Sequence, residues 1–185
     1  MPTLTFSPVP PYVGVTFSEK EFTEFQKQLG VTASKLFKAK RKDFIGYFHI
    51  IAKHSGKCLD VSEFSQENCA NVFQCTLHGG DNQQWILVKT PDGYFYIFAK
   101  HSGKCLDVEE YKQDDCANVW QYAFHGGDNQ KWELRDIGNG YFHVIAKHSG
   151  KCLDVEGYKQ DDCANVWQIT LHGGDNQQWK LVPIK

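Results

Sequence analysis

The 185-residue chain lacks several features that would place it in other classes of protein. No apolar run approaches the roughly 20 residues of a membrane-spanning helix. The N-terminus has neither a basic start nor an apolar stretch, so we expect no secretory signal. No Asn-x-Ser/Thr glycosylation site occurs either. We therefore expect a protein without a membrane span that is cytoplasmic, or secreted without a leader.

Positive charge is also scarce beyond the first 45 residues. Residues 46–185 carry thirteen Lys/Arg against eighteen Asp/Glu. A nucleic-acid-binding face must be basic because it neutralises phosphates, so we expect no nucleic-acid partner. The chain has no Cys-x-x-Cys motif and no Cys/His spacing typical of zinc ligands. We expect no metal site and no cofactor.

Cysteine is present but irregular in number. Six of the seven cysteines form three pairs, each spaced by eleven residues: Cys58 and Cys69, Cys105 and Cys116, Cys152 and Cys163. Cys75 is the odd one. Reduced, partly buried thiols are the first interpretation, because cytosolic chains seldom hold disulfides. One bridge within each pair is the alternative.

The sequence repeats itself three times with a period of 47 residues. Gly46-Tyr47-Phe48 returns as Gly93-Tyr94-Phe95 and as Gly140-Tyr141-Phe142. Each block contains Cys-Leu-Asp-Val early and His-Gly-Gly-Asp-Asn-Gln late. A fixed period of this length indicates a repeat architecture, and a site built from one block should exist in three copies.

Each block is expected to form four short strands separated by turn residues; in the first block the fourth strand spans 83–88. Three such blocks close on each other around a pseudo-threefold axis and leave no open sheet edge. We therefore predict an all-β protein, a β-trefoil of three repeats of about 47 residues. Its domain would be residues 46–185, with repeats 46–92, 93–139 and 140–185.

Residues 1–45 form a different, N-terminal extension. Its start is rich in proline, and Ser18 to Glu21 has the pattern of a helix capping box. Phe22, Phe25 and Leu29 follow at helical spacing, and a basic linker completes the extension. We expect a short helix packed on the barrel and a solvated linker; a homo-oligomer contact through residues 1–45 is the alternative.

Three elements recur in register within the blocks. The first is Gln-x-Trp, the second is the aspartate of Cys-Leu-Asp-Val, and the third is an aromatic residue twelve positions before the Gln-x-Trp tryptophan. In this pattern the chain resembles the ricin-B-type (R-type) lectins. The resemblance covers residues 46–185, and it implies a structural role for Trp85, Trp132 and Trp179.

The resemblance also implies three sugar-binding sites. The candidate residues are Asp60, Asn71, Phe73, His78, Asn82 and Gln83 in the first repeat; Asp107, Asn118, Trp120, His125, Asn129 and Gln130 in the second; and Asp154, Asn165, Trp167, His172, Asn176 and Gln177 in the third. The chemistry agrees: an aromatic ring covers the apolar face of a pyranose, a carboxylate accepts hydroxyl protons, and an amide donates and accepts at the rim. The histidines would line the rim or order their turns.

We therefore expect a metal-independent lectin that binds galactose- or N-acetylgalactosamine-containing glycans through up to three sites and cross-links or agglutinates cells.

The family's common disulfide would correspond to Cys58 with Cys75, although Tyr122 and Ile169 replace the second cysteine in the other repeats. Purely structural roles for these side chains remain the alternative to binding. An enzyme is not expected, because glycosidases need two carboxylates flanking one bond. The remaining alternatives are a β-trefoil protein-interaction module, or a lectin that delivers an N-terminal effector or oligomerisation segment.

Overall fold

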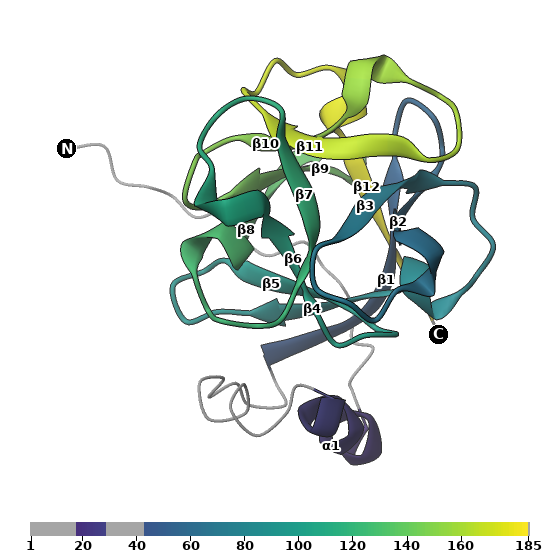
Figure 1. The fold of residues 1–185 in the computed structure, drawn as a ribbon, viewed down its shortest axis with the longest axis vertical. Coiled ribbons are helices and arrows are strands. Elements are labelled where there is room, and N and C mark those ends of the chain that lie inside the picture. Colours follow the sequence, from purple (N-terminus) through teal and green to yellow (C-terminus); the bar gives the residue numbers. More distant parts are fainter. Residues whose placement is uncertain (1–17, 29–42, 185) are drawn as a thin grey trace.

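The computed structural model describes residues 18–28 and 43–184. Within them lie one α-helix and twelve β-strands (Figure 1). The first repeat contains β1 (Phe44–Ala52), β2 (Cys58–Val61), β3 (Ala70–Cys75) and β4 (Trp85–Lys89). The second contains β5 (Phe95–Ala99), β6 (Cys105–Val108), β7 (Ala117–Tyr122) and β8 (Trp132–Gly138). The third contains β9 (Tyr141–Ala146), β10 (Cys152–Val155), β11 (Ala164–Ile169) and β12 (Trp179–Pro183). The helix, α1, spans Glu19–Gln28.

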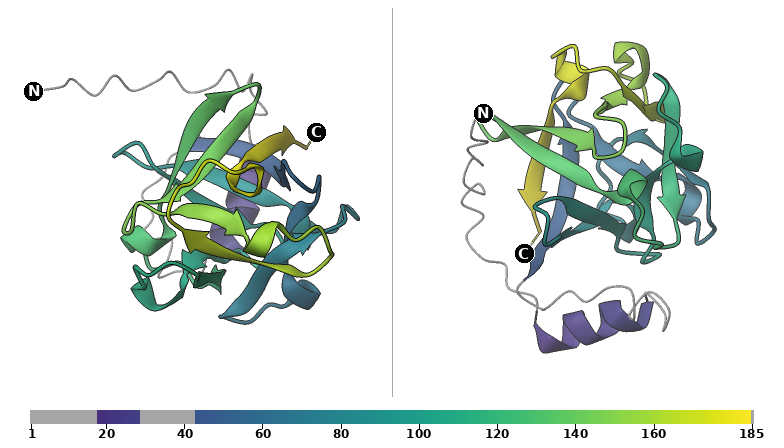
Figure 2. Two further views of the ribbon diagram at one scale, coloured as in Figure 1. Left: turned by 90° about the horizontal axis from the view of Figure 1, so that it is seen from above. Right: turned by 90° about the vertical axis from the view of Figure 1, so that its left-hand side faces the viewer.

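The first and fourth strands of the repeats close into a six-stranded barrel. Around it, β1 pairs with β4, β4 with β5, β5 with β8, β8 with β9, β9 with β12 and β12 with β1, all antiparallel. The three inner hairpins β2–β3, β6–β7 and β10–β11 form a cap, in which β3, β7 and β11 pair with one another. The β8–β9 hairpin extends beyond the rest of the barrel (Figure 2). This arrangement confirms the predicted β-trefoil.

The core of the barrel is apolar and threefold repeated. Trp85, Trp132 and Trp179 are fully buried, and each indole Nε1–H donates to a leucine carbonyl of its own repeat at 2.9–3.0 Å. A buried indole needs such a partner, because an unpaired N–H is costly away from water. These tryptophans thus tie the fourth strand of each repeat to its second strand.

The glutamine of Gln-x-Trp lies outside the predicted fourth strand. Gln83 ends a 3-10 turn, η3 (Asp81–Gln83), and β4 begins only at Trp85. The second and third repeats have the same turns, η5 (Asp128–Gln130) and η7 (Asp175–Gln177). The prediction of a strand over 83–88 was therefore wrong at its start, because the turn directs the glutamine side chain inward rather than across a ladder.

A second glutamine in each repeat joins neighbouring repeats. Gln74 on β3 is buried, and its amide donates to the carbonyl oxygens of Lys159 and Asp161 in the third repeat at 2.9 and 3.0 Å. Gln121 and Gln168 make equivalent bonds to the loops of the first and second repeats. The repeats therefore depend on one another for satisfied polar groups as well as for their shared core.

Helix α1 has the predicted capping box. The Glu21 N–H donates to Ser18 Oγ at 3.2 Å, and the Ser18 N–H donates back to Glu21 Oε2 at 2.8 Å. These bonds satisfy backbone donors that have no partner within the helix. The predicted helix positions Leu29 and Gly30, and the basic linker, lie outside the described residues.

The helix packs against one face of the barrel, as expected (Figures 1 and 2). Phe25 is buried, with its ring edge-on to Phe44 and Phe98 at centroid distances of 5.5 and 5.1 Å. The receiving surface includes Ile86 and Val88 of β4. The positions equivalent to Ile86 and Val88 in the other two repeats are Glu133 and Arg135 on β8, and Lys180 and Val182 on β12. Three of these four residues are polar. The choice of docking face therefore follows from where the symmetry of the repeats is broken.

Phe25→Ala is expected to release α1 while leaving the barrel folded. Removing a buried phenylalanine side chain typically costs about 3–5 kcal/mol, and Phe25 is the one fully buried residue of this helix. Amide hydrogen exchange should show loss of protection in residues 19–28 with no change in β1–β12. Glu24→Ala, at an exposed helix position, is the control. Unchanged protection of α1 in Phe25→Ala would show that docking does not depend on this ring.

Candidate functional site

A buried aspartate forms the centre of each candidate site. Asp60, Asp107 and Asp154 lie in the second strands β2, β6 and β10, and each is only 2% exposed. Each is directly opposite the recurring aromatic residue of the next strand, namely Phe73, Trp120 or Trp167. The hairpin register therefore places carboxylate and aromatic ring side by side.

In the second and third repeats the aromatic residue donates a hydrogen bond to the carboxylate. Trp167 Nε1 lies 2.9 Å from Asp154 Oδ1, and Trp120 Nε1 lies 2.9 Å from Asp107 Oδ1. Both indoles are half-buried, so part of each ring remains accessible. The bond fixes the ring orientation, and a charged acceptor makes it stronger than a neutral pair.

The turn histidine provides a second partner for the carboxylate. His172 Nε2 lies 3.2 Å from Asp154 Oδ2, and His78 and His125 make the same contact to Asp60 and Asp107. The Gly174 N–H donates to His172 Nδ1, so the ring proton is on Nε2 and points at the carboxylate. The histidine side chains are 42–45% exposed. They thus both order their turns and form the solvent-facing edge of the site.

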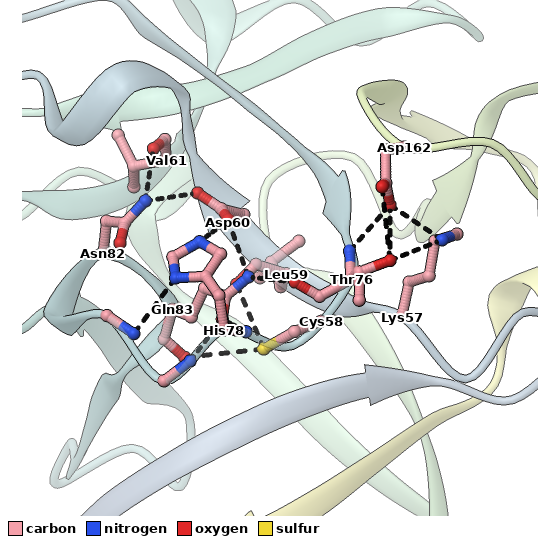
Figure 3. A network of polar contacts seen from close by, with 12 residues as sticks. Lys57, Cys58, Leu59, Asp60, Val61, Thr76, His78, Asn82, Gln83 and Asp162 are labelled. Carbon is pink, nitrogen blue, oxygen red and sulfur yellow. Dashed lines mark hydrogen bonds and ion pairs between the residues drawn. The ribbon is translucent and has the colours of Figure 1, made fainter.

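The asparagine of the 3-10 turn donates to the carboxylate in the first and third repeats, where Asn176 Nδ2 lies 2.8 Å from Asp154 Oδ2, whereas Asn129 donates to the Val108 carbonyl. In the first repeat, Asn82 Nδ2 donates to Asp60 Oδ1 at 2.6 Å and Gln83 Nε2 donates to Asp60 Oδ2 at 2.8 Å (Figure 3). Gln83 Oε1 in turn accepts the N–H groups of His78 and Gly79. One glutamine therefore connects the carboxylate to the His-Gly-Gly turn that presents the histidine.

The second glycine of each His-Gly-Gly turn is required by close packing. A Cβ at Gly80, Gly127 or Gly174 would lie 2.6–2.7 Å from the amide oxygen of the site asparagine and 2.7–2.8 Å from the histidine Cε1. Real Cβ atoms do not approach other atoms so closely. The turn can therefore fold over the asparagine only with glycine at this position.

Burial dominates the electrostatics of the three aspartates. Desolvation raises the pKa of Asp60, Asp107 and Asp154 above the ordinary value. Hydrogen bonds to the charged form oppose this rise: the largest opposing contribution comes from Gln83 at Asp60, from Trp120 at Asp107 and from Trp167 at Asp154. The hydrogen-bond donors around each carboxylate therefore offset part of the desolvation cost of its ionised form.

The first repeat departs from the other two. Phe73 has no N–H, so Asp60 receives no bond of the kind that Trp120 and Trp167 make. Cys75 stands where the other repeats have Tyr122 and Ile169. Although Cys58 and Cys75 are direct partners across β2 and β3, all seven cysteines are free thiols. Neither the disulfide implied by the resemblance nor a bridge between the eleven-spaced cysteines is present.

The structure gives Asn71, Asn118 and Asn165 partners other than those expected. Their side chains bond to one another in a closed ring: Asn71 donates to Asn165, Asn165 to Asn118 and Asn118 to Asn71, at 2.9–3.0 Å. Each amide oxygen and one N–H are thus used to join the repeats at the axis, where β3, β7 and β11 meet. We leave these three residues out of the candidate sites.

One set of aromatic side chains at the sites was not anticipated. Phe64, Tyr111 and Tyr158 are about half exposed and adopt left-handed backbone conformations, with φ between +56° and +62°. The hydroxyls of Tyr111 and Tyr158 accept the N–H groups of Asp128 and Asp175, at the start of the site turns. The sequence signal was available, because an aromatic residue follows each site aspartate by four positions in all three repeats.

These aromatic rings are supported from the neighbouring repeat. His54, His101 and His148 lie edge-on to Tyr158, Phe64 and Tyr111 at centroid distances of 5.0–5.6 Å. Each of these histidines also contacts a backbone carbonyl of the neighbouring loop through Nε2. Every site therefore includes structural support from a second repeat.

Comparison with known proteins identifies the family and the class of fold. The family described as "Ricin-type beta-trefoil lectin domain-like" matches residues 34–122 and 128–185. The chain belongs to this family, which confirms the resemblance seen in the sequence. A comparison with curated protein sequences gave no significant match.

Two solved structures are similar in both sequence and fold. The designed threefold-symmetric protein ThreeFoil is 55% identical with a TM-score of 0.74, over 75% of this chain and 99% of that protein. An exo-β-1,3-galactanase from Clostridium thermocellum is 39% identical with a TM-score of 0.74; the match covers 75% of this chain but only 30% of the galactanase. The trefoil thus corresponds to a minor part of that enzyme.

A third structure shares the fold at lower identity. The Macrolepiota procera ricin B-like lectin, solved in complex with lactose, is 20% identical with a TM-score of 0.64, over 75% of this chain and 95% of the lectin. Across residues 18–28 and 43–184, no helix is both long and apolar enough to span a bilayer.

Trp120→Phe should destabilise the protein in a pH-dependent way. The change removes a hydrogen bond to a charged acceptor, which is worth about 1.5–3 kcal/mol, and raises the pKa of Asp107 further. The pKa of Asp107 is higher in the folded protein than in the unfolded chain. Its protonation therefore stabilises the fold at pH values below the unfolded pKa, and this stabilisation is lost as pH rises through the folded pKa. The free-energy difference between wild type and variant should therefore grow as pH rises through the folded-state pKa of Asp107, and level off once Asp107 is ionised in both proteins.

Denaturant unfolding at several pH values measures this difference, and Trp167→Phe provides an independent copy of the experiment in the third repeat. A difference that does not change with pH would mean that the indole contributes packing alone.

Proposed function

We propose that the chain is a lectin for galactose- or N-acetylgalactosamine-containing glycans, with its binding sites at the three buried aspartates. The observation that carries this proposal is the bond from the indole N–H of Trp120 or Trp167 to a buried aspartate, which holds each half-buried ring in one orientation. Side chains that served packing alone would have no need to present an oriented ring to solvent in register with a carboxylate.

In the proposed site the aspartate does not contact the sugar as a freely accessible carboxylate would. Asp107 and Asp154 are buried, and both oxygens of Asp154 accept N–H groups of the chain. We therefore assign the aspartate mainly to orienting the ring and the histidine. The indole face would cover the apolar C–H surface of the sugar, and the histidine edge and the exposed tyrosine hydroxyl would meet its rim.

The galactoside assignment is supported by the relatives. The galactanase that is 39% identical acts on a galactan, as its name states, and the Macrolepiota lectin was solved with lactose, which contains galactose. An axial 4-hydroxyl leaves a continuous C–H patch beside it, which suits a flat aromatic platform.

The three sites are not expected to be equal. Phe73 cannot orient itself through an N–H bond to Asp60, so we assign the first repeat the weakest site. Single sites on such shallow surfaces have dissociation constants in the millimolar range, about −4 kcal/mol. Several sites on one rigid body gain avidity on clustered glycans, from which we infer cross-linking or agglutination.

We further propose that residues 46–185 are the binding domain and that the chain is not an enzyme. In the described part of the chain each site has a single buried aspartate, and the neighbouring acids Glu63 and Glu110 are exposed on the surface. Glycosidase chemistry needs two carboxylates flanking one bond. The apolar side of α1 is covered by β4 and β5, which does not favour that helix as a free effector or oligomerisation segment.

Calorimetric titration with galactose and N-acetylgalactosamine tests the proposal, with mannose as the control sugar. We expect saturable binding of two to three sugars per chain with millimolar affinity. Trp120→Ala and Trp167→Ala should each remove one site, whereas Arg135→Ala, which changes an exposed charge on the β8–β9 hairpin, should remove none. Absence of heat with either galactoside at high concentration would contradict the sugar assignment while leaving the fold unaffected.

A further inference from the structure

A group of three metal-ligating side chains is present in the first repeat. The donor atoms of Asp60, Cys75 and His78 all lie within 4.8 Å of one another. They come from β2, the end of β3 and the turn before η3, so no short sequence motif links them. Asp60 is buried, Cys75 is half-buried and His78 is exposed, which leaves an approach from solvent.

The group exists only where the first repeat departs from the other two. In the second and third repeats, Tyr122 and Ile169 occupy the position of Cys75 and bring no thiol to the aspartate and histidine. The first repeat also replaces the tryptophan with Phe73, so its aspartate lacks the indole N–H that the other two accept. Both departures favour a cation: one adds a soft donor, and the other removes a competing hydrogen-bond donor.

We propose that the first repeat binds a Zn²⁺ ion through Cys75 Sγ, His78 Nε2 and a carboxylate oxygen of Asp60. Thiolate, imidazole and carboxylate together form a donor set that suits zinc, which takes three protein ligands plus an open position at bond lengths of about 2.0–2.3 Å. The edge of such a tetrahedron between nitrogen and oxygen ligands is about 3.3 Å. His78 Nε2 and Asp60 Oδ2 already lie 3.1 Å apart.

Binding breaks two bonds to hydrogen, the S–H of Cys75 and the Nε2–H of His78, and transfers no electrons. The Cys75 S–H proton is released to solvent as the Zn–S bond forms. The His78 proton moves from Nε2 to Nδ1, which gives up the hydrogen bond that Nδ1 accepts from the Gly80 N–H. That bond is 3.2 Å long, so its loss is a small cost. The carboxylate of Asp60 keeps its bonds from Asn82 and Gln83, which orient it as a ligand.

The ion shares Asp60 and His78 with the first candidate sugar site. Occupancy by zinc would therefore remove this site from sugar binding and leave the second and third repeats unaffected. The first repeat would thus bind a metal with the same strands and turns that form the candidate sugar sites in the other two repeats. Zinc binding there does not depend on the proposal that the chain binds galactosides.

The test uses the full chain, freed of metal and kept reduced with a phosphine. Titration of Zn²⁺ in competition with a chromophoric chelator should give one bound ion per chain, and Co²⁺ should give a thiolate-to-metal charge-transfer band. Cys75→Ile, which installs the residue of the third repeat, should abolish that band. It should weaken zinc binding by more than about 100-fold, because even lost outer-shell partners cost 10–100-fold.

Matched variants separate this site from other thiols and histidines. Cys163→Ala removes an exposed thiol, and His125→Ala removes the equivalent histidine of the second repeat; both should bind zinc as wild type does, whereas His78→Ala should not. Equal zinc affinity in wild type and Cys75→Ile would overturn the proposal, as would the absence of a bound ion in the wild type. Circular dichroism of each variant confirms that the fold is retained.

Discussion

The structure depends on a carboxylate buried once in every repeat. Taking a charged group out of water is costly unless it is hydrogen-bonded, and the sequence around each site supplies the donors. In the first repeat the 3-10 turn brings both asparagine and glutamine to the carboxylate, and in all three repeats the glutamine holds the His-Gly-Gly turn. In the second and third repeats a tryptophan completes the set. The same constraint that fixes the local fold thus orients the aromatic ring that we propose for sugar binding.

Closure of the three repeats is the second requirement. No repeat satisfies all of its polar groups alone: the buried glutamines of β3, β7 and β11 reach into neighbouring loops, and the ring of three asparagines needs one member from each repeat. The exposed aromatic residues of the sites are likewise held by histidines from a neighbour. The sites are therefore properties of the closed trefoil and not of an isolated 47-residue unit.

Much of the fold and part of the site follow from the sequence. The 47-residue period, the short strands and the three Gln-x-Trp motifs predict a trefoil, and the family resemblance names Asp107 and Trp120 as members of one candidate site. The capping box at Ser18 predicts the start of α1. These features are local or repeat at a fixed interval, so they can be recognised from the sequence alone.

The remaining features arise from contacts between distant residues. The bond between Asn71 and Asn165 spans two repeats, and nothing in either neighbourhood distinguishes it from a sugar contact. The approach of Cys75 to His78 and Asp60 depends on the register of β2 with β3 and on the turn that follows. The docking face of α1 is chosen by Ile86 and Val88, whose role is evident only when the three repeats are superposed.

The central claim is that the buried aspartates hold Trp120 and Trp167 as sugar-binding platforms, while the other three tryptophans belong to the core. The most direct test is a nitrogen–proton correlation spectrum of the five indole N–H groups during titration with lactose. The account predicts that the Trp120 and Trp167 signals shift in a saturable manner and that those of Trp85, Trp132 and Trp179 remain in place. Static Trp120 and Trp167 signals at saturating lactose, or equal shifts of all five indoles, would contradict it.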